Sequence, residues 1–181
     1  MVFLVADTDE AIICAEYITR SGSMPLIQEY ISADNGEYTV GVLSLPNGEL
    51  VGSIALRRSL DAKLSVMVRN RTGVISSGYS QGYIGDFPDI RRQCELIAKA
   101  IGSKGPLNIQ GRLKGGAFVP FEINPRFSAS TYLRAMAGFN EADMTLQYLS
   151  SGIIPKVNSV KEGWYLRSLT EQYVSTDEVR S

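Results

Sequence analysis

Oxygen-bearing side chains gather in two strand-like runs in the second half of the chain. Glu122 and Asn124 lie two residues apart in one run, and Gln110 lies in the run before it. Because side chains two apart in a strand share a face, Glu122 and Asn124 should point the same way. One carboxylate and two amide oxygens are hard ligands, which Mg²⁺ or Mn²⁺ accepts when phosphates and water complete the coordination. The three side chains therefore predict a divalent-metal site.

An arginine follows this pair directly. Arg126 comes after Pro125, which should end the strand and direct the arginine. A guanidinium offers a planar fork of donors to a phosphate or acyl-phosphate oxygen, so Arg126 is a candidate catalytic residue. From spacing alone, a polar strand face followed by an Asn-Pro turn is a more common explanation than a metal site.

The metal site depends on the register of one hairpin, formed by residues 107–113 and 118–123. A loop of three residues, Lys114–Gly116, pairs Leu113 with Ala117, Gln110 with Pro120 and Asn108 with Glu122. Gln110, Glu122 and Asn124 then share one face, while Phe121 and Ile123 point into a core. A two-residue loop would slip the register by one and turn Gln110 away. We therefore predict three loop residues or an equivalent bulge.

Turn signals and hydrophobic periodicity predict the elements that carry these residues. Strands are expected at residues 2–6, 25–31, 37–45, 50–57, 64–69, 107–113, 118–123 and 164–174. Helices are expected from Asp7 to about Ser21, from about Phe87 to Ile101 behind an Asp86 N-cap, at 131–137 and at 141–148. Antiparallel hairpins with helices packed against the sheet indicate an α+β fold.

Composition excludes several classes of chemistry. The chain of 181 residues has no histidine, which excludes histidine metal ligands and His-based triads. Cys14 and Cys94 form no CxxC motif, so a disulfide framework or zinc site is not expected and a reducing cytoplasm fits. The net charge of −1 gives no argument for binding nucleic acid or an anionic membrane. No apolar stretch approaches the ~20 residues that span a bilayer.

The run from Pro120 to Gly138, with Gln110 upstream, resembles the metal and phosphate signature of ATP-grasp enzymes. It is similar to the large subunit of carbamoyl-phosphate synthase, and the resemblance covers about residues 25–138. It implies that Glu122 bridges magnesium ions that hold the ATP phosphates, that Asn124 ligates one of them, and that Gln110 is an auxiliary ligand. It also implies that Arg126 stabilises the transferred phosphoryl group or an acyl phosphate.

The same resemblance implies an adenine site. Gln28–Ile31 resembles the linker whose main chain reads the adenine, which makes Glu29, Tyr30 and Ile31 nucleotide-binding residues. Glu37 matches the acid that takes the ribose hydroxyls, since a carboxylate can accept two hydroxyl donors. Taken alone, Glu29 and Glu37 are more often solvated strand residues.

Two parts of an ATP-grasp domain are implied. Residues 1–24 resemble a remnant of the upstream subdomain, and residues 25–181 the C-terminal nucleotide- and metal-binding subdomain. The glycine-rich loop and lysine that close over the triphosphate are expected upstream of residue 1. We therefore expect this chain alone not to be an active ligase, and expect the upstream part or a second copy as a partner.

The resemblance implies ATP-dependent activation of a carboxylate, such as bicarbonate, to an acyl phosphate that an amine attacks. One alternative is a ligase of the same superfamily with an amino-acid substrate, because the Ser77–Gly82 loop departs from the His-x-Gly-Asp-Ser pattern of synthase relatives. Another is a non-enzymatic binding or structural domain. Weaker candidates for phosphate contacts are Arg57, Arg58 and Lys63, for which a solvated charged turn is at least as common an explanation. Arg134 is a weaker candidate for lining the acceptor site, with a surface or packing role as the default.

Overall fold

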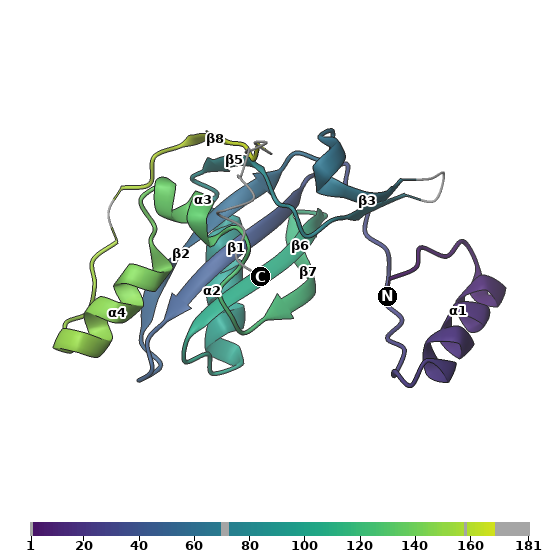
Figure 1. Ribbon diagram of the computed structural model, residues 1–181, viewed down its shortest axis with the longest axis horizontal. Coiled ribbons are helices and arrows are strands. Elements are labelled where there is room, and N and C mark those ends of the chain that lie inside the picture. The colour runs from purple at the N-terminus through teal and green to yellow at the C-terminus, as the bar shows by residue number, and fades with distance from the viewer. Residues whose placement is uncertain (1, 70–72, 158, 169–181) are drawn as a thin grey trace, which may run out of the picture.

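The computed structural model describes residues 2–69, 73–157 and 159–168. A six-stranded antiparallel sheet in the order β7-β6-β1-β2-β5-β8 forms its centre (Figure 1). The strands are β1 (Glu37–Ser44), β2 (Leu50–Arg58), β5 (Gly82–Gly85), β6 (Pro106–Lys114), β7 (Ala117–Asn124) and β8 (Gly163–Tyr165). A small second sheet joins β3 (Val66–Arg69) and β4 (Val74–Ser76). The predicted α+β architecture with an antiparallel sheet is confirmed.

Strand β1 lies between β6 and β2, and all eight of its residues are buried. It forms the predicted hairpin with β2, in which Gly48 adopts φ 88° and its N–H donates to Leu45 O. The pairing of β1 with β6 joins residues about seventy positions apart, such as Glu37 and Arg112. This non-local pairing brings β6 and β7 beside β1 and so assembles the polar face described below.

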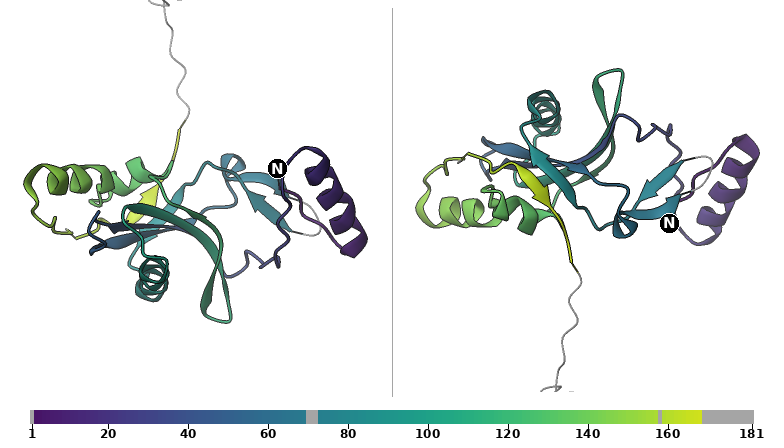
Figure 2. Two further views of the ribbon diagram at one scale, coloured as in Figure 1. Left: turned by 90° about the horizontal axis from the view of Figure 1, so that it is seen from below. Right: turned by 90° about the horizontal axis from the view of Figure 1, so that it is seen from above.

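Helices cover both faces of the sheet (Figure 2). On one face α2 (Pro88–Ala100) buries Ile90, Cys94 and Ala98 against Val40, Val42, Leu107 and Ile109. On the other face α3 (Thr131–Met136) and α4 (Glu141–Ser151) pack Leu133, Phe139 and Met144 on Leu43, Ile54, Leu56 and Ile84. The two cores use alternate residues of the same strands, as the period-2 geometry of a strand requires. The helices predicted at 131–137 and 141–148 are confirmed, with α4 extended by three residues.

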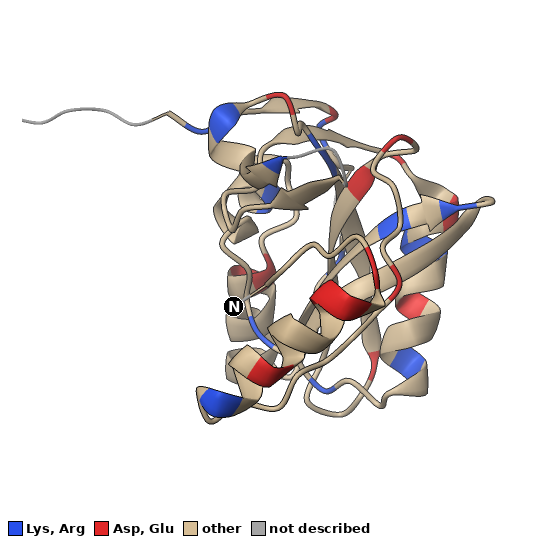
Figure 3. Cartoon of the chain, turned by 90° about the vertical axis from the view of Figure 1, so that its right-hand side faces the viewer, with Lys and Arg blue, Asp and Glu red and all other residues tan. Residues whose placement is uncertain are grey.

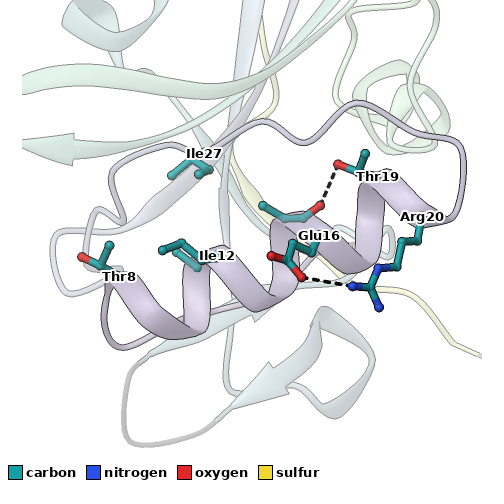
Figure 4. Close-up of a pocket in the computed structure, with 8 residues that line it drawn as sticks. Thr8, Ile12, Glu16, Thr19, Arg20 and Ile27 are labelled. Atoms are coloured by element: carbon teal, nitrogen blue, oxygen red, sulfur yellow. Dashed lines mark hydrogen bonds and ion pairs between the residues drawn. The ribbon is translucent and has the colours of Figure 1, made fainter.

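The N-terminal region lies beyond the small β3–β4 sheet, at one end of the structure (Figure 1). Its helix α1 (Thr8–Arg20) begins directly after Asp7, whose side chain accepts a hydrogen bond from Glu10 N at 2.9 Å. A groove of about 410 Å³ lies along α1 opposite Ile27, and apolar side chains such as Ile12 share its lining with polar and charged ones such as Glu16 and Arg20 (Figure 4). Residues 2–6 and 25–31 follow irregular paths, so the two strands predicted there are wrong. The spacing of their apolar residues is typical of strands, but neither segment pairs with a neighbouring strand.

Three further expectations need correction. Phe87, not Asp86, takes the N-cap position of α2, and Asp86 accepts from Arg91 Nη1 at 2.9 Å. Strand β5 was missed because its Gly-rich sequence carries a weak strand signal. The run expected at 164–174 gives only the short β8, and residues 169–174 lie outside the described residues. Among the described residues, no helix is long and apolar enough to cross a membrane.

The two cysteines should differ in reactivity. Cys94 lies on the face of α2 that packs on the sheet, where it is fully buried. Burial is the main cause that raises the pKa of its thiol to about 12, and the nearby Glu95 carboxylate is the second. The thiolate is the nucleophile, so Cys94 stays a thiol and inert at neutral pH. We expect a thiol reagent at pH 7.5 to modify Cys14, which is partly exposed, and Cys94 only after denaturation. Peptide mass mapping measures this, and labelling of native Cys94 at the rate of Cys14 would contradict it.

Candidate active site

The β6–β7 hairpin reaches the expected side-chain arrangement by a different route. Its loop has two residues, Gly115 and Gly116, with φ 58° and 83°, and Lys114 pairs with Ala117. Positive φ at both central residues is typical of a type I′ turn. The predicted pairs Leu113–Ala117, Gln110–Pro120 and Asn108–Glu122 are therefore wrong.

A bulge restores the register. The pairing shifts between Gln110 and Gly111, so that Gly111 lies opposite Pro120 while Gln110 lies opposite Glu122 and Asn108 opposite Asn124. Glycine suits this point, because a Cβ on Gly111 would meet Phe118 Cζ at 2.5 Å and Val119 O at 2.6 Å. The hairpin therefore combines a two-residue loop with the bulge that was predicted as the equivalent of a three-residue loop.

The three predicted oxygen-bearing side chains come together on the strands. Gln110 Nε2 donates to Glu122 Oε2 at 3.0 Å, and Asn124 Nδ2 donates to Glu122 Oε1 at 2.8 Å. Each carboxylate oxygen of Glu122 thus accepts one amide N–H group, and Glu122 is exposed to solvent. The Gln110 Oε1 atom accepts from Arg58 Nη1 at 3.3 Å.

The alternation expected for β7 is only partly right. Phe121 sits at the bulge, where it lines the same cleft as Glu122 and lies beside Arg112, whose guanidinium carbon is 5.8 Å from its ring centroid. Ile123 is 40% exposed and so does not join a core. The bulge turns Phe121 towards the polar side, and β7 is an edge strand with little to cover Ile123.

Arg126 lies directly beyond β7, as expected. Strand β7 ends at Asn124, and Arg126 N donates back to Asn124 O at 2.9 Å, closing a tight turn over Pro125. The guanidinium is exposed and donates through Nη1 to Phe127 O at 3.0 Å. It lines the cleft that holds Glu122, so most of its donors face open space that an anion can enter.

A cleft of about 470 Å³ opens over this cluster. Its lining combines Asn108, Gln110, Glu122 and Arg126 with the loop residues Ser77, Gly78, Ser80, Ser128 and Ala129. A second pocket of about 240 Å³, lined by residues 28–31 and 74–76, adjoins it. Both cavities are lined by Val2, Gln28, Ile75, Ser76 and Phe121, so they form one elongated depression.

The residues predicted to read adenine line the second pocket. Glu29 directs its side chain away to Lys114 Nζ at 2.6 Å, an exposed ion pair. Within the described residues, the main-chain N–H and C=O of Glu29 make no hydrogen bond with the rest of the chain. Tyr30 is anchored, since its hydroxyl accepts from Val74 N at 2.8 Å and its ring lies 5.0 Å from the Arg112 guanidinium carbon. The Ile31 carbonyl accepts from Arg112 Nη1 at 2.6 Å.

Glu37 does not occupy the position predicted for it. The side chain is fully buried, with Oε1 3.0 Å from Arg58 Nη1 and Oε2 2.8 Å from Arg112 Nη2. Both carboxylate oxygens are therefore engaged by arginines, and this burial removes Glu37 from the predicted contact with ribose hydroxyls. Burial lowers the pKa of Arg58 from its ordinary value, and the adjacent Glu37 carboxylate opposes that effect.

The arginines that flank Glu37 fasten the surrounding loops to the sheet. Arg112 also donates from Nη2 to Val74 O at 2.7 Å, and Arg58 from Nη2 to Ser77 O at 2.7 Å. Arg58 is thus neither the solvated turn residue nor the phosphate contact considered from the sequence. We call Arg58, Glu37 and Arg112 the buried charge triad.

A second buried cluster lies beneath the cleft, between the sheet and α3. Arg134 and Glu141 are 3.3 Å apart and each is 1% exposed. Arg134 Nη2 donates to Asn108 Oδ1 at 2.6 Å, and Thr39 Oγ1 donates to the same oxygen at 2.9 Å. Arg134 therefore has the packing role, and it orients Asn108 at the floor of the cleft.

Residues 23–172 match the family described as "ATP-grasp in the biosynthetic pathway with Ter operon". This chain belongs to that ATP-grasp family. The matched segment contains the whole sheet, α2 to α4, and every residue of the cluster around Glu122. The finer resemblance to carbamoyl-phosphate synthase and the division at residue 24 stay predictions.

Solved structures with a similar fold include two ligases. D-alanine–D-alanine ligase from Bacillus anthracis, complexed with ATP, is 18% identical with a TM-score of 0.49, covering 79% of this chain and 47% of its own. L-amino acid ligase from Bacillus licheniformis is 16% identical with a TM-score of 0.47, covering 80% of this chain and 35% of its own. The ATP-grasp chain thus spans less than half the length of either. It matches no curated protein sequence.

The donor set of this ATP-grasp chain fits a nucleotide-bound magnesium ion better than a metal held by protein alone. Among the described residues, no group of three or more His, Cys, Asp or Glu side chains could hold a metal ion. A cation at Glu122 would depend on one carboxylate, an amide oxygen, and phosphate and water oxygens. Magnesium in nucleotide sites is bound in that way, through one or two carboxylates and the substrate phosphates.

Sequence reasoning missed Arg112, and the signal for it was non-local. Arg112 lies directly opposite Glu37 on neighbouring strands, as a cross-strand pair of opposite charge. An acid in the run 37–45 and an arginine in the run 107–113 were visible in the sequence. The pairing of β1 with β6 across about seventy residues was not.

Proposed function

We propose that this chain is the nucleotide- and metal-binding part of an ATP-dependent ligase that activates a carboxylate as an acyl phosphate for attack by an amine. One observation carries the proposal. Glu122 and Arg126 line a cleft that shares lining residues with a second pocket lined by residues 28–31, and Asn124 donates to the Glu122 carboxylate from the same strand. An elongated depression with apolar walls at one end and oxygen ligands at the other suits Mg-ATP.

The proposal gives each residue a physical task. The main chain of Glu29 and the N–H group of Ile31 contact the adenine edge. Tyr30, which Arg112 holds in place, forms one side of the adenine site. Glu122 and Asn124 would hold Mg²⁺ or Mn²⁺, which would neutralise phosphate charge when bound. Arg126, exposed at the cleft, donates to the oxygens of the transferred phosphoryl group, where negative charge develops.

The reaction needs positioning rather than a protein nucleophile. A substrate carboxylate oxygen attacks the γ-phosphorus of ATP, ADP leaves, and the acyl phosphate loses phosphate when an amine attacks its carbonyl carbon. Such transfers are driven mainly by alignment and charge stabilisation. The carboxylate is bicarbonate if the carbamoyl-phosphate synthase resemblance extends to substrate, and an amino acid otherwise.

Calorimetry with ATP tests the proposal. We expect ATP to bind this chain in 5 mM MgCl₂ and to bind at least about tenfold more weakly in EDTA, because charge-assisted contacts each contribute about 1.5–3 kcal/mol. CTP, whose base presents a different edge, serves as the matched control. Absence of ATP binding by this chain, and by a longer chain that carries any upstream part, would favour a non-enzymatic domain.

A further inference from the structure

Two loops line the cleft that holds Glu122 and Arg126. The 77–81 loop runs from β4 to β5 and contributes Ser80, and the 125–130 loop runs from β7 to α3 and contributes Ala129. Within the described residues, no hydrogen bond runs directly from one loop to the other. A hydrogen-bonded link between them has to come from another part of the chain.

Arg167 supplies this link. It lies two residues beyond β8, and its guanidinium donates from Nε to Ser80 O at 3.0 Å and from Nη2 to Ala129 O. These carbonyls belong to residues 87 and 38 positions earlier in the chain. A guanidinium suits two acceptors at once, because its donors form a rigid planar fork. One side chain from the end of β8 thus holds both loops.

The backbone at Arg167 is itself held in place. Strand β8 pairs with β5, where Tyr165 lies opposite Gly82, and the Tyr165 side chain is buried in the core beneath α3 and α4. Beyond the strand, Arg167 N donates to Gln81 Oε1 at 3.1 Å, and Gln81 is also buried. The arginine therefore reaches the loops from a point that the sheet fixes.

The guanidinium of Arg167 is satisfied by carbonyls and not by a carboxylate. Lys and Arg are interspersed with Asp and Glu in the view of Figure 3, yet half-buried Arg167 forms no ion pair with any residue that the structure describes. The carbonyl oxygens of Ser80 and Ala129 are turned to its positive charge. Their partial negative charge is thereby compensated, which suits a wall beside an anionic ligand.

We infer that Arg167 is a positioning residue, which joins the 77–81 and 125–130 loops and so fixes the wall of the cleft beside Glu122 and Arg126. Its effect on a nucleotide rests on the proposed function, whereas the link between the loops does not. Ser80 and Ala129 line this cleft and not the pocket at residues 28–31. Arg167 should therefore matter for the outer phosphates and not for the base.

Amide hydrogen exchange, followed by NMR without ligand, tests the link. Tyr79 N donates to Ser77 Oγ at 3.1 Å in one loop, and Thr131 N donates to Ser128 O at 3.0 Å where the other loop ends. We expect Arg167→Met to speed exchange at both amides about tenfold, the equivalent of one hydrogen bond to a charged group. Val40, paired on both sides in β1, should not change. Faster exchange in one loop only, or in neither, overturns the inference.

Nucleotide binding tests where the link acts. The same labelled protein is titrated with Mg-ATP and with AMP, which has the same base but lacks the outer phosphates. We expect Arg167→Met to weaken Mg-ATP binding about tenfold and to leave AMP affinity unchanged, because the loops line only the cleft at Glu122. Equal losses for both ligands would indicate general loosening of the site and would contradict the inference.

Two further variants separate the link from charge and from damage to the fold. Arg167→Lys keeps the charge but lacks the fork, so it should resemble Arg167→Met in both measurements, and it replaces that variant if Arg167→Met does not fold. Restored Mg-ATP affinity with fast exchange in Arg167→Lys would assign the effect to charge alone and overturn the inference. Arg92→Met is the matched control on α2, where the side chain is 74% exposed, and should change neither measurement.

The outcomes distinguish this inference from the proposed function. A wild-type chain that binds neither Mg-ATP nor AMP contradicts the proposed function, and hydrogen exchange then decides the link by itself. A wild-type chain that binds Mg-ATP, with unchanged exchange in Arg167→Met, contradicts only the inference. Faster exchange in both loops with a loss confined to Mg-ATP supports both.

Discussion

Replacing Glu122 with alanine is expected to lower the affinity for Mg-ATP about a hundredfold, the largest effect of any single change in the cleft. Glu122 supplies the only carboxylate among Gln110, Glu122 and Asn124, and both neighbouring amides donate to it. Its removal costs the charged contact to the cation and leaves those two amides without an acceptor, together about 3 kcal/mol. Calorimetry with Mg-ATP measures the loss.

Arg126→Ala should weaken the same binding less, by about tenfold or below. Arg126 is exposed, and in the proposed function it contacts the transferred phosphoryl group mainly as charge develops, so its expected contribution to ground-state binding is modest. Glu29→Ala is the matched control, because the Glu29 side chain turns to Lys114 and the proposed function assigns only its main chain to the adenine. A larger loss for Arg126→Ala than for Glu122→Ala would indicate direct ground-state phosphate contact and would contradict this order.

Glu141→Ala is expected to destabilise the fold by about 3–5 kcal/mol, the usual cost of removing one partner of a buried ion pair. Arg134 and Glu141 are each 1% exposed, so the substitution leaves a buried guanidinium whose Nε already has no partner within the described residues. Arg134 also holds Asn108, so the loss extends to the floor of the cleft. Urea denaturation followed by circular dichroism measures the change in unfolding free energy.

An exposed pair provides the comparison for this prediction. Glu16→Ala breaks the contact with Arg20 on α1, where the side chains are 62% and 81% exposed. Solvent screens such pairs, so the expected change is below about 1 kcal/mol. Equal effects of Glu16→Ala and Glu141→Ala would show that the buried pair is not a stability determinant.

Local signals in the sequence were sufficient for much of the fold. The Asn47-Gly48 turn predicts the β1–β2 hairpin, and the apolar spacing of Ile90, Cys94 and Ile97 predicts α2. These succeed because turn chemistry and helix periodicity act over a few residues. Residues 25–31 failed for the opposite reason, since an apolar run becomes a strand only where another strand is available to pair with it.

The candidate site was predictable in part. The side chains of Glu122 and Asn124 follow from strand alternation, and the bulge at Gly111 brings Gln110 to them. The burial of Glu37 was not predictable, because Arg58 and Arg112 reach it from two other strands, 21 and 75 residues away. Sequence patterns predict the face of a strand on which a side chain lies, but they do not predict which distant side chain it contacts.

The bracing of the elongated depression has a mechanical consequence. Arg112 reaches from β6 to the carbonyls of Ile31 and Val74, which belong to the linker and to β4 on the adenine side. Arg58 reaches from β2 to the loop at Ser77 and to Gln110 on the phosphate side. Arg58 and Arg112 each hold one oxygen of the Glu37 carboxylate. If a nucleotide binds along the depression as proposed, a displacement of residues 28–31 by the base would reach the loop at Ser77 through Glu37, which itself would not contact the nucleotide.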